Sequence, residues 1–325
     1  MAIGAILFLF GAPIGVLLWL TAVPGISFAG PLPPLTLAEA QTAQRLRDHV
    51  VAIASIPHNI THPAALERSA RTIERELVGL GYAVRRQAFS VDRHIVRNLD
   101  VTIEPARADA PTLVIGAHYD SAYDAPGAND NGTGAAAVLE LARALRDLRG
   151  KAAMRIRLAL FVNEEPPYFQ NPGMGSLVYA QHLVASGEKV AAMFSLETLG
   201  YYSDQPGSQR YPAPLNLLYP DTGNFVAFVG MTGSRPLVRK SVALFRALAR
   251  FPSQGGSAPG WVSGIDWSDH WSFAQFGVPA VMVTDTAPFR YGYYHTRQDT
   301  PDRVDYTRLA RVVSGLAAMI RDWRP

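Results

Sequence analysis

Short apolar runs alternate with amphipathic helical stretches through most of this chain, and this alternation restricts the fold more than any other feature. Buried strands that alternate with helices are typical of a mostly parallel sheet covered on both faces. The sequence therefore predicts an α/β fold, a three-layer sandwich with a mostly parallel central sheet. The apolar runs cover residues 113–117, 156–162, 190–196, 225–229 and 278–284, and the helical stretches cover residues 134–148, 175–186, 237–249 and 303–321.

Two helices and two half-exposed strands are expected before the first of these runs. Thr36 and Glu39 form a capping box, which predicts the start of a helix, and Gly81 is placed to end a second one. No internal repeat or second linker follows, so residues 36–325 are predicted to form one domain. The helices are expected over residues 36–55 and 63–80, and the strands over residues 83–91 and 98–104.

The amino-terminal segment is apolar enough to enter a membrane. Residues 3–22 contain no ionisable side chain, and twenty helical residues span roughly 30 Å, the thickness of a bilayer core. We interpret residues 1–23 as a transmembrane anchor, with a cleaved signal segment ending near residues 27–29 as the alternative. The Pro/Gly-rich residues 24–35 are expected to form an extended, unpacked linker. The domain is therefore expected outside the cytoplasm, anchored to the membrane, or secreted if the segment is cleaved.

Composition excludes several classes of protein. The chain has 325 residues, 48% of them hydrophobic, which is ample for a folded core. Its net charge is only +3, with no dense basic cluster, so no nucleic-acid partner is expected. There is no cysteine, which excludes disulfides, thiolate metal sites and cysteine catalysis. The sequence makes no prediction of the oligomeric state.

Acidic and histidine residues follow the predicted strands, where ligands bind in open α/β sheets. Two histidines and several carboxylates, without cysteine, suit zinc bound through nitrogen and oxygen. Asp120 lies two residues after His118 and is expected to hold the second ring nitrogen of that imidazole. Glu164 and Glu165 are expected to divide two roles, one binding metal and the other taking a proton from water. The residues concerned lie in HYDS at 118, GANDNG at 127, EE at 164, E at 197 and YHT at 294.

These motifs, in this order, resemble peptidase family M28, the zinc aminopeptidase-like family. The match covers about residues 40–325 and reads HYDS at 118, GANDNGTG at 127, NEE at 163, SLETLGY at 195, SDHWSF at 268 and YHTRQDTPD at 294. The resemblance implies the phosphorylase/hydrolase-like zinc exopeptidase fold and a site for two Zn²⁺ ions. It implies that Asp130 bridges the ions and is followed by a cis peptide bond.

The same resemblance implies a role for each remaining residue of the site. His118 and Glu197 would complete one metal site, and Glu165 and His295 the other. Glu164 resembles the general base of the family. One departure is Glu197, because the best-known aminopeptidases of the family have Asp at this position; glutamate remains a sound oxygen ligand.

Further residues are expected near the site. Asp269, in SDHWSF, is expected to accept a hydrogen bond from substrate or from a neighbouring group, and His270 is an alternative ligand. Tyr294 either polarises the scissile carbonyl or packs against His295. Residues 166–174 form either the pocket rim or a surface loop, and residues 201–219 are expected to lie on the substrate side.

The resulting hypothesis is metal-dependent hydrolysis of a peptide or aminoacyl substrate, with removal of the amino-terminal residue. Two alternatives stay open. Glutaminyl cyclases share the fold and nearly the same ligands but use one zinc ion. A non-catalytic peptidase-like ectodomain is the second alternative, although receptor-like relatives usually lose ligands or the base, which are all present here.

Overall fold

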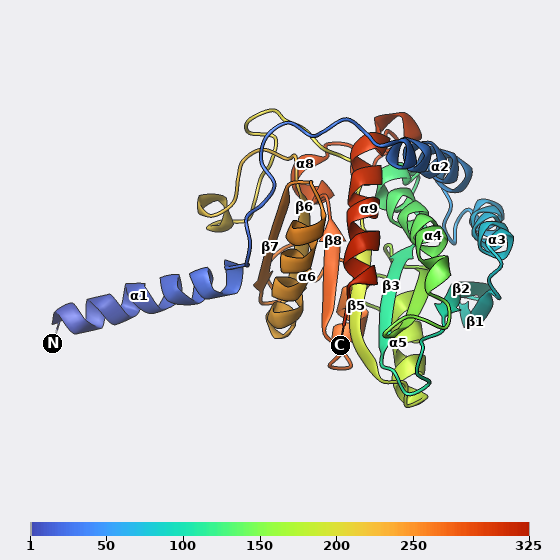
Figure 1. Cartoon of the computed structure of the whole chain (residues 1–325), viewed down its shortest axis with the longest axis horizontal. Coiled ribbons are helices and arrows are strands. Elements are labelled where there is room, and N and C mark those ends of the chain that lie inside the picture. The colour runs from blue at the N-terminus through green and yellow to red at the C-terminus, as the bar shows by residue number, and fades with distance from the viewer. Residues whose placement is uncertain (1, 325) are drawn as a thin grey trace.

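The computed structural model describes the backbone of residues 2–324 and the side chains of residues 12–324. An eight-stranded sheet, ordered β1-β2-β4-β3-β5-β8-β6-β7, runs through the centre of the domain (Figure 1). The strands are β1 (Arg85–Val91), β2 (His94–Ile103), β3 (Thr112–His118), β4 (Arg155–Phe161), β5 (Val190–Glu197), β6 (Val226–Met231), β7 (Ser253–Ala258) and β8 (Ala280–Thr284). The helices are α1 (Ala2–Thr21), α2 (Leu37–Ala54), α3 (Pro63–Gly79), α4 (Thr133–Leu145), α5 (Gly175–Ala185), α6 (Arg235–Leu248), α7 (His270–Ala274), α8 (Ala287–Arg290) and α9 (Tyr306–Arg321).

The sheet is mixed: four of its seven strand pairings are parallel and three are antiparallel. Its central strands β4, β3, β5 and β8 are parallel, as expected for strands that alternate with helices. β1 and β2 pair antiparallel because only Asp92 and Arg93 connect them, both with positive φ, as two-residue hairpins require. β2 is also antiparallel to β4, and β6 to β8. The prediction of parallel pairing therefore holds for the centre of the sheet and for the edge pair of β6 and β7, and fails at the three antiparallel pairings.

Helices cover both faces of the sheet, so the three-layer architecture is confirmed. A large core lies between one face and helices α2, α4, α6 and α9, and a smaller core lies between the other face and helices α5 and α7. Alternation along β5 divides its side chains between them: Phe194 and Leu196 enter the large core, and Met193 enters the small one. The capping box of Thr36 and Glu39 opens α2 as predicted.

The amino-terminal segment is helical and projects away from the domain (Figure 1). Its end contacts the domain, because Ser257 Oγ donates to the Leu20 carbonyl (3.0 Å) and Arg235 Nε donates to the Trp19 carbonyl (2.7 Å). The anchor predicted over residues 1–23 lies partly outside the described residues. Within the described part of the chain, no helix meets the length and hydropathy needed to cross a membrane.

The linker that follows is packed, which corrects the expectation of an unpacked path. Val23 and Leu32 lie against the large core, so the linker contributes apolar surface to the domain. Arg246 Nη1 donates to the carbonyls of Pro24 (3.0 Å) and Gly25 (2.7 Å). The linker therefore follows a defined route along the domain.

Candidate metal centre

Three neighbouring strands place their carboxyl ends at one edge of the sheet. His118 is the last residue of β3, Glu197 is the last residue of β5, and Glu164 and Glu165 follow the end of β4. Because β4, β3 and β5 are adjacent and parallel, these side chains converge. All four are buried.

Asp130 lies between the two histidines. It belongs to the short helical turn Ala128–Gly132 that precedes α4, and its peptide bond to Asn131 is cis, as the resemblance implied. Asp130 Oδ1 lies 3.4 Å from His118 Nε2, and Oδ2 lies 3.0 Å from His295 Nε2. One carboxylate therefore faces both imidazoles, the arrangement that a bridging ligand requires.

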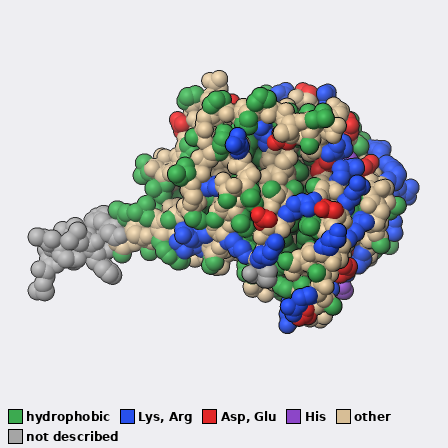
Figure 2. All heavy atoms as spheres, in the orientation of Figure 1, with side chains coloured by type: hydrophobic (Ala, Val, Ile, Leu, Met, Phe, Trp, Pro, Cys, Tyr) green, Lys and Arg blue, Asp and Glu red, His purple; other side chains and the backbone are tan. Residues whose placement is uncertain are grey.

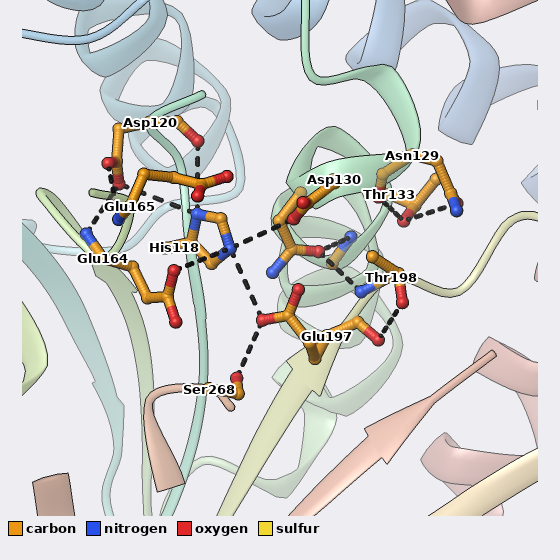
Figure 3. Close-up of polar contacts among 12 residues, drawn as sticks. His118, Asp120, Asn129, Asp130, Thr133, Glu164, Glu165, Glu197, Thr198 and Ser268 are labelled. Carbon is orange, nitrogen blue, oxygen red and sulfur yellow. Dashed lines mark hydrogen bonds and ion pairs between the residues drawn. The ribbon is translucent and has the colours of Figure 1, made fainter. Parts of the chain in front are cut away.

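A second carboxylate accompanies each histidine. Glu197 Oε2 lies 3.4 Å from His118 Nε2, and Glu165 Oε2 lies 3.2 Å from His295 Nε2. Glu164 Oε2 is also near, at 3.7 Å from His118 Nε2 (Figure 3). The structure thus brings together all five residues expected as ligands, with the expected base beside them.

Several nitrogen and oxygen atoms of this cluster that could bind a metal lack hydrogen-bond partners. Among the described residues, His118 Nε2, His295 Nε2, Asp130 Oδ2 and Glu165 Oε1 are buried and make no hydrogen bond. An unsatisfied buried polar atom costs about 1–3 kcal/mol, so such a concentration requires a compensating ligand. Two imidazole nitrogens and several carboxylate oxygens, without thiolate, fit Zn²⁺.

The electrostatics of the cluster also require a cation. Burial raises the pKa of Glu165 to about 7 and that of Glu197 to about 8, and it raises the pKa of Glu164 well above its usual range. Within the described part of the chain, the ion pairs of these three carboxylates involve only histidines. A bound metal would supply the positive charge that no lysine or arginine provides.

His295 responds to the same carboxylates. Burial alone would lower its pKa, but the negative charges of Asp130 and Glu165 outweigh burial and raise the pKa to about 11. The two carboxylates therefore strongly favour a positive charge beside this imidazole.

The backbone around the cluster turns sharply. Asn163, Thr198 and His295, each next to or within the ligand set, have positive φ values of 59°, 46° and 58°. Non-glycine residues adopt this conformation at an energetic cost, and such residues concentrate at functional sites. At Asn163, two residues after the end of β4, the chain changes direction immediately before Glu164 and Glu165.

Asp120 supports the cluster in a different way from the one expected. Its carboxylate oxygens accept hydrogen bonds from the backbone N–H groups of Glu164 (3.1 Å) and Glu165 (3.2 Å). His118 Nδ1 lies 3.2 Å from the Asp120 carbonyl and 3.6 Å from its carboxylate. The carboxylate of Asp120 therefore mainly positions the two glutamates.

Two supporting residues were missed by the sequence reasoning. Asp299 accepts hydrogen bonds from the backbone N–H groups of Asn129 (2.8 Å) and Asp130 (3.1 Å) and from the Tyr291 hydroxyl (2.9 Å). Ser268 Oγ donates to Glu197 Oε2 at 2.8 Å. Both lie in the quoted motifs, YHTRQDTPD and SDHWSF, which is the only signal in the sequence that points to them.

Of the other predicted residues, Asp269 and Tyr294 lie near the cluster and His270 points elsewhere. Asp269 is fully buried, and burial raises its pKa to about 6. The Tyr294 ring stacks on the His295 ring, with centroids 3.9 Å apart and planes at 18°, which favours the packing alternative. His270 Nε2 lies 2.7 Å from the Ile265 carbonyl, and its ring belongs to none of the ligand groups found among the described residues.

The two loops singled out in the sequence have different positions. Residues of the 201–219 loop line a cleft beside Glu197, as expected for a substrate-side loop. The 166–174 loop does not line this cleft. It is tied down by hydrogen bonds from Tyr168 to Asp92 (2.6 Å) and from Gln170 to Asp266 (3.0 Å), which favours the surface-loop alternative.

Comparison with known families agrees with this geometry. The family model described as "Peptidase family M28" matches residues 98–320. The chain belongs to this family. It is 39% identical over 264 residues to the uncharacterized protein YfbL of Escherichia coli (strain K12), covering 78% of this chain and 80% of YfbL. It is 29% identical to aminopeptidase YwaD of Bacillus subtilis (strain 168), covering 63% of this chain and 40% of YwaD.

Solved structures share the fold of this M28 chain. BSAP, a zinc aminopeptidase from Bacillus subtilis, superposes with a TM-score of 0.68 at 15% identity, over 89% of this chain and 95% of BSAP. A glutaminyl cyclase from Fimbriiglobus ruber superposes with a TM-score of 0.63 at 21% identity, over 93% of this chain and all of the cyclase. At these identities the likeness concerns the fold alone.

Proposed function

We propose that this protein is a zinc-dependent aminopeptidase that binds two metal ions and removes the amino-terminal residue of a peptide. The observation that carries the proposal is the position of Asp130, whose two oxygens face His118 and His295, each accompanied by its own glutamate. M28 membership and relatives named as aminopeptidases support the reaction class. His118 and Glu197 would hold one ion, and Glu165 and His295 the other.

When bound, zinc lowers the pKa of water and polarises the scissile carbonyl. Glu164 acts as the general base: a carboxylate oxygen takes the proton of the attacking water and then donates it to the leaving amine. The hydrogen bond from Glu164 N to Asp120 keeps the base in position.

Glutaminyl cyclisation is the second candidate, because a cyclase shares the fold over nearly the whole chain. The residue types of the ligands do not separate the two reactions, but Asp130 lies between two sets of donors, His118 with Glu197 and Glu165 with His295, and this arrangement supports two ions and therefore hydrolysis.

Metal analysis of the purified protein, combined with a panel of aminoacyl amides, tests the proposal. We expect about two zinc ions per chain, and cleavage of amides with a free α-amine but not of the same amides with an acetylated amine. Cyclisation of an N-terminal glutaminyl peptide, with one zinc per chain and no amide hydrolysis, would establish the cyclase instead.

We also propose that residues 3–22 attach the protein to a membrane, with the catalytic domain outside the cytoplasm. The uncharged sequence of this segment supports the proposal. Fractionation tests it: the full chain should sediment with membranes and resist salt extraction, whereas a chain that begins at Leu35 should not. Equal partition of both chains into the soluble fraction would contradict membrane attachment.

A further inference from the structure

A cleft extends from the metal centre along the sheet toward β7. Glu197 and Tyr294 lie at its inner end, and Thr21, at the end of α1, lies at its outer end. Its volume is about 880 Å³, including the mouth that opens to solvent. The cleft therefore connects the reacting centre with the amino-terminal segment.

The floor of the cleft sets its length. The floor crosses from the end of β5, through Met282 of β8 and Val229 of β6, to Gly256 of β7. Neighbouring strands lie about 4.8 Å apart, so three spacings give a length of about 14 Å. An extended chain advances about 3.3–3.6 Å for every three bonds, so this length accommodates roughly twelve bonds in a row. That is far longer than the side chain of leucine.

Two glycines of β7 allow close packing on both faces of this part of the sheet. Helix α6 covers the opposite face of β6 and β7, and a Cβ on Gly255 would lie 2.5 Å from Val242 of that helix. The next residue, Gly256, faces the cleft, where a Cβ would lie 2.2 Å from Tyr219 Oη. A side chain at position 256 would therefore collide with the wall formed by Tyr219.

The lining is mostly apolar, and several of its polar groups are hydrogen-bonded within the protein. Among the described lining residues, Glu197 is the only Asp, Glu, Lys or Arg. The hydroxyl of Tyr219 donates to Gly255 O (3.0 Å), and that of Tyr211 donates to Pro220 O (2.8 Å). Gln209 Oε1 accepts hydrogen bonds from Thr286 (3.0 Å) and Arg290 (2.6 Å). A charged or strongly polar ligand would find few free partners there.

Exposed apolar side chains continue from the lining to the surface. Leu217 is 80% exposed and Trp261 is 85% exposed, and each lies a few residues from lining residues of its own loop. The space-filling view shows the side of the molecule covered by α6 and α9, where Lys and Arg side chains gather on the right-hand half and hydrophobic side chains are frequent on the half near the amino-terminal segment (Figure 2). Leu217 and Trp261 thus place exposed apolar side chains on two loops that line the cleft.

From these observations we propose that the cleft binds a long apolar chain on the acyl side of the scissile bond. The substrate class is a 2-aminoacyl amide whose amino-terminal residue bears an unbranched alkyl group longer than any genetically encoded apolar side chain. The proposal rests on the proposed aminopeptidase function, because the reacting carbonyl must lie at the metal centre. From there the alkyl group would extend across β8 and β6 toward Thr21.

A homologous series of 2-aminoacyl p-nitroanilides with linear alkyl side chains of one to twelve carbons tests the proposal on the full zinc-loaded chain. Each buried methylene is expected to raise kcat/KM about fourfold, and the rise should continue beyond six carbons. A plateau or decline at four carbons, with efficient cleavage of the short members, would overturn the proposal while leaving the aminopeptidase function intact. No cleavage of any member would instead contradict the proposed function.

A substitution in the floor of the cleft tests whether the alkyl chain binds there. V229F fills the middle of the floor from a half-buried strand position, and it should lower kcat/KM for the ten-carbon substrate at least tenfold while leaving the alanyl substrate unchanged. V190F makes the same substitution at a half-buried position at the other end of β5 and should change neither. An equal response of both substrates to V229F would overturn the assignment of the cleft. If V229F does not fold, an inhibitor series of linear alkylamines against the unaltered chain should show the same dependence on length, and its absence would likewise overturn the proposal.

Discussion

Two groups of buried carboxylates in this protein are neutralised in different ways. Glu140 on α4 is almost fully buried and pairs with Arg45 (2.7 Å) and His49 (3.3 Å) of α2. Burial opposes its ionisation, but these two partners outweigh burial and lower its pKa to about 2. Asp100 is similarly buried between Arg85 (2.7 Å) and Arg157 (2.8 Å).

The carboxylates at the carboxyl ends of the strands have no arginine or lysine partner among the described residues, and their ion pairs involve only His118 and His295. Glu165 and Glu197 are as deeply buried as Glu140, yet burial raises their pKa values to about 7 and about 8. Where a carboxylate serves the fold, the chain provides the cation. At the carboxyl ends of the strands, by contrast, Asp130 and Glu165 keep oxygens without hydrogen-bond partners. This difference indicates where an external cation would bind.

Removal of the shared ligand should have the largest effect. In the proposed two-ion site D130A would deprive both ions of an oxygen, so we expect loss of both zinc ions and activity at background level. Metal content and hydrolysis of alanyl p-nitroanilide should be measured together. D124A is the control, because Asp124 is exposed and pairs only at the surface with Arg297 and His62. Retention of both ions by D130A would contradict the bridging role.

The adjacent glutamates should separate chemistry from metal binding. E164Q preserves shape but cannot take a proton, so kcat should fall by about 10²–10⁴-fold while zinc content stays unchanged. E165Q should lose zinc as well as activity. Steady-state kinetics and metal analysis of both variants measure kcat and zinc content. Reversed phenotypes would mean that Glu165 is the base and Glu164 the ligand. Unchanged turnover in both variants would refute this interpretation of the site.

A smaller effect is expected for the residue that holds the bridging loop. Asp299 accepts the N–H groups of Asn129 and Asp130, and D299N replaces one acceptor oxygen by an amide that donates. We expect zinc affinity to fall about 10–100-fold, with kcat restored by excess zinc. Titration with a competing chelator measures this. An affinity equal to that of the unaltered chain would show that Asp299 does not position the bridge.

The smallest effect is expected for Glu140, which the chain neutralises with Arg45 and His49, and it should appear in stability alone. E140Q should lower the free energy of unfolding by about 1–3 kcal/mol at neutral pH without affecting activity. Because the folded-state pKa of Glu140 lies below its usual 4.5, the difference from the unaltered chain should persist above pH 4.5 and shrink as the pH falls toward about 2. Urea unfolding of both proteins across this range measures it.

The exposed pair of Asp147 and Arg321 offers a control for that experiment. D147N should change stability by at most about 1 kcal/mol. A pH-independent difference for E140Q would mean that its effect does not arise from the ionised pair.

Sequence reasoning recovered the centre of the molecule better than its edge. The apolar runs at residues 113–117 and 190–196 became β3 and β5, because strands buried on both faces must be apolar throughout. β7 was missed, since its sequence, SQGGSA, has no apolar pattern. Its two glycines leave room for the side chains of Tyr219 and Val242, which come close to β7 only in the folded chain.

The same division applies to the site. His118, Glu165 and Glu197 were predictable because they directly follow recognisable strands. Asp299 was not assigned a role, because its partners are backbone N–H groups about 170 positions away, and main-chain donors leave no trace in sequence letters. For the same reason the carboxylate of Asp120 was assigned to the imidazole, whereas it binds the backbone of two glutamates.

The position of Asp130 between two histidines has a consequence for biosynthesis. A ribosome makes His118, Asp130 and Glu165 long before it makes His295, so the second half of the site stays open until the last strand and its following loop have emerged. A chain interrupted before His295 would lack the imidazole that faces Asp130 Oδ2. Any activity that depends on His295 would therefore begin only when synthesis of the chain is nearly finished.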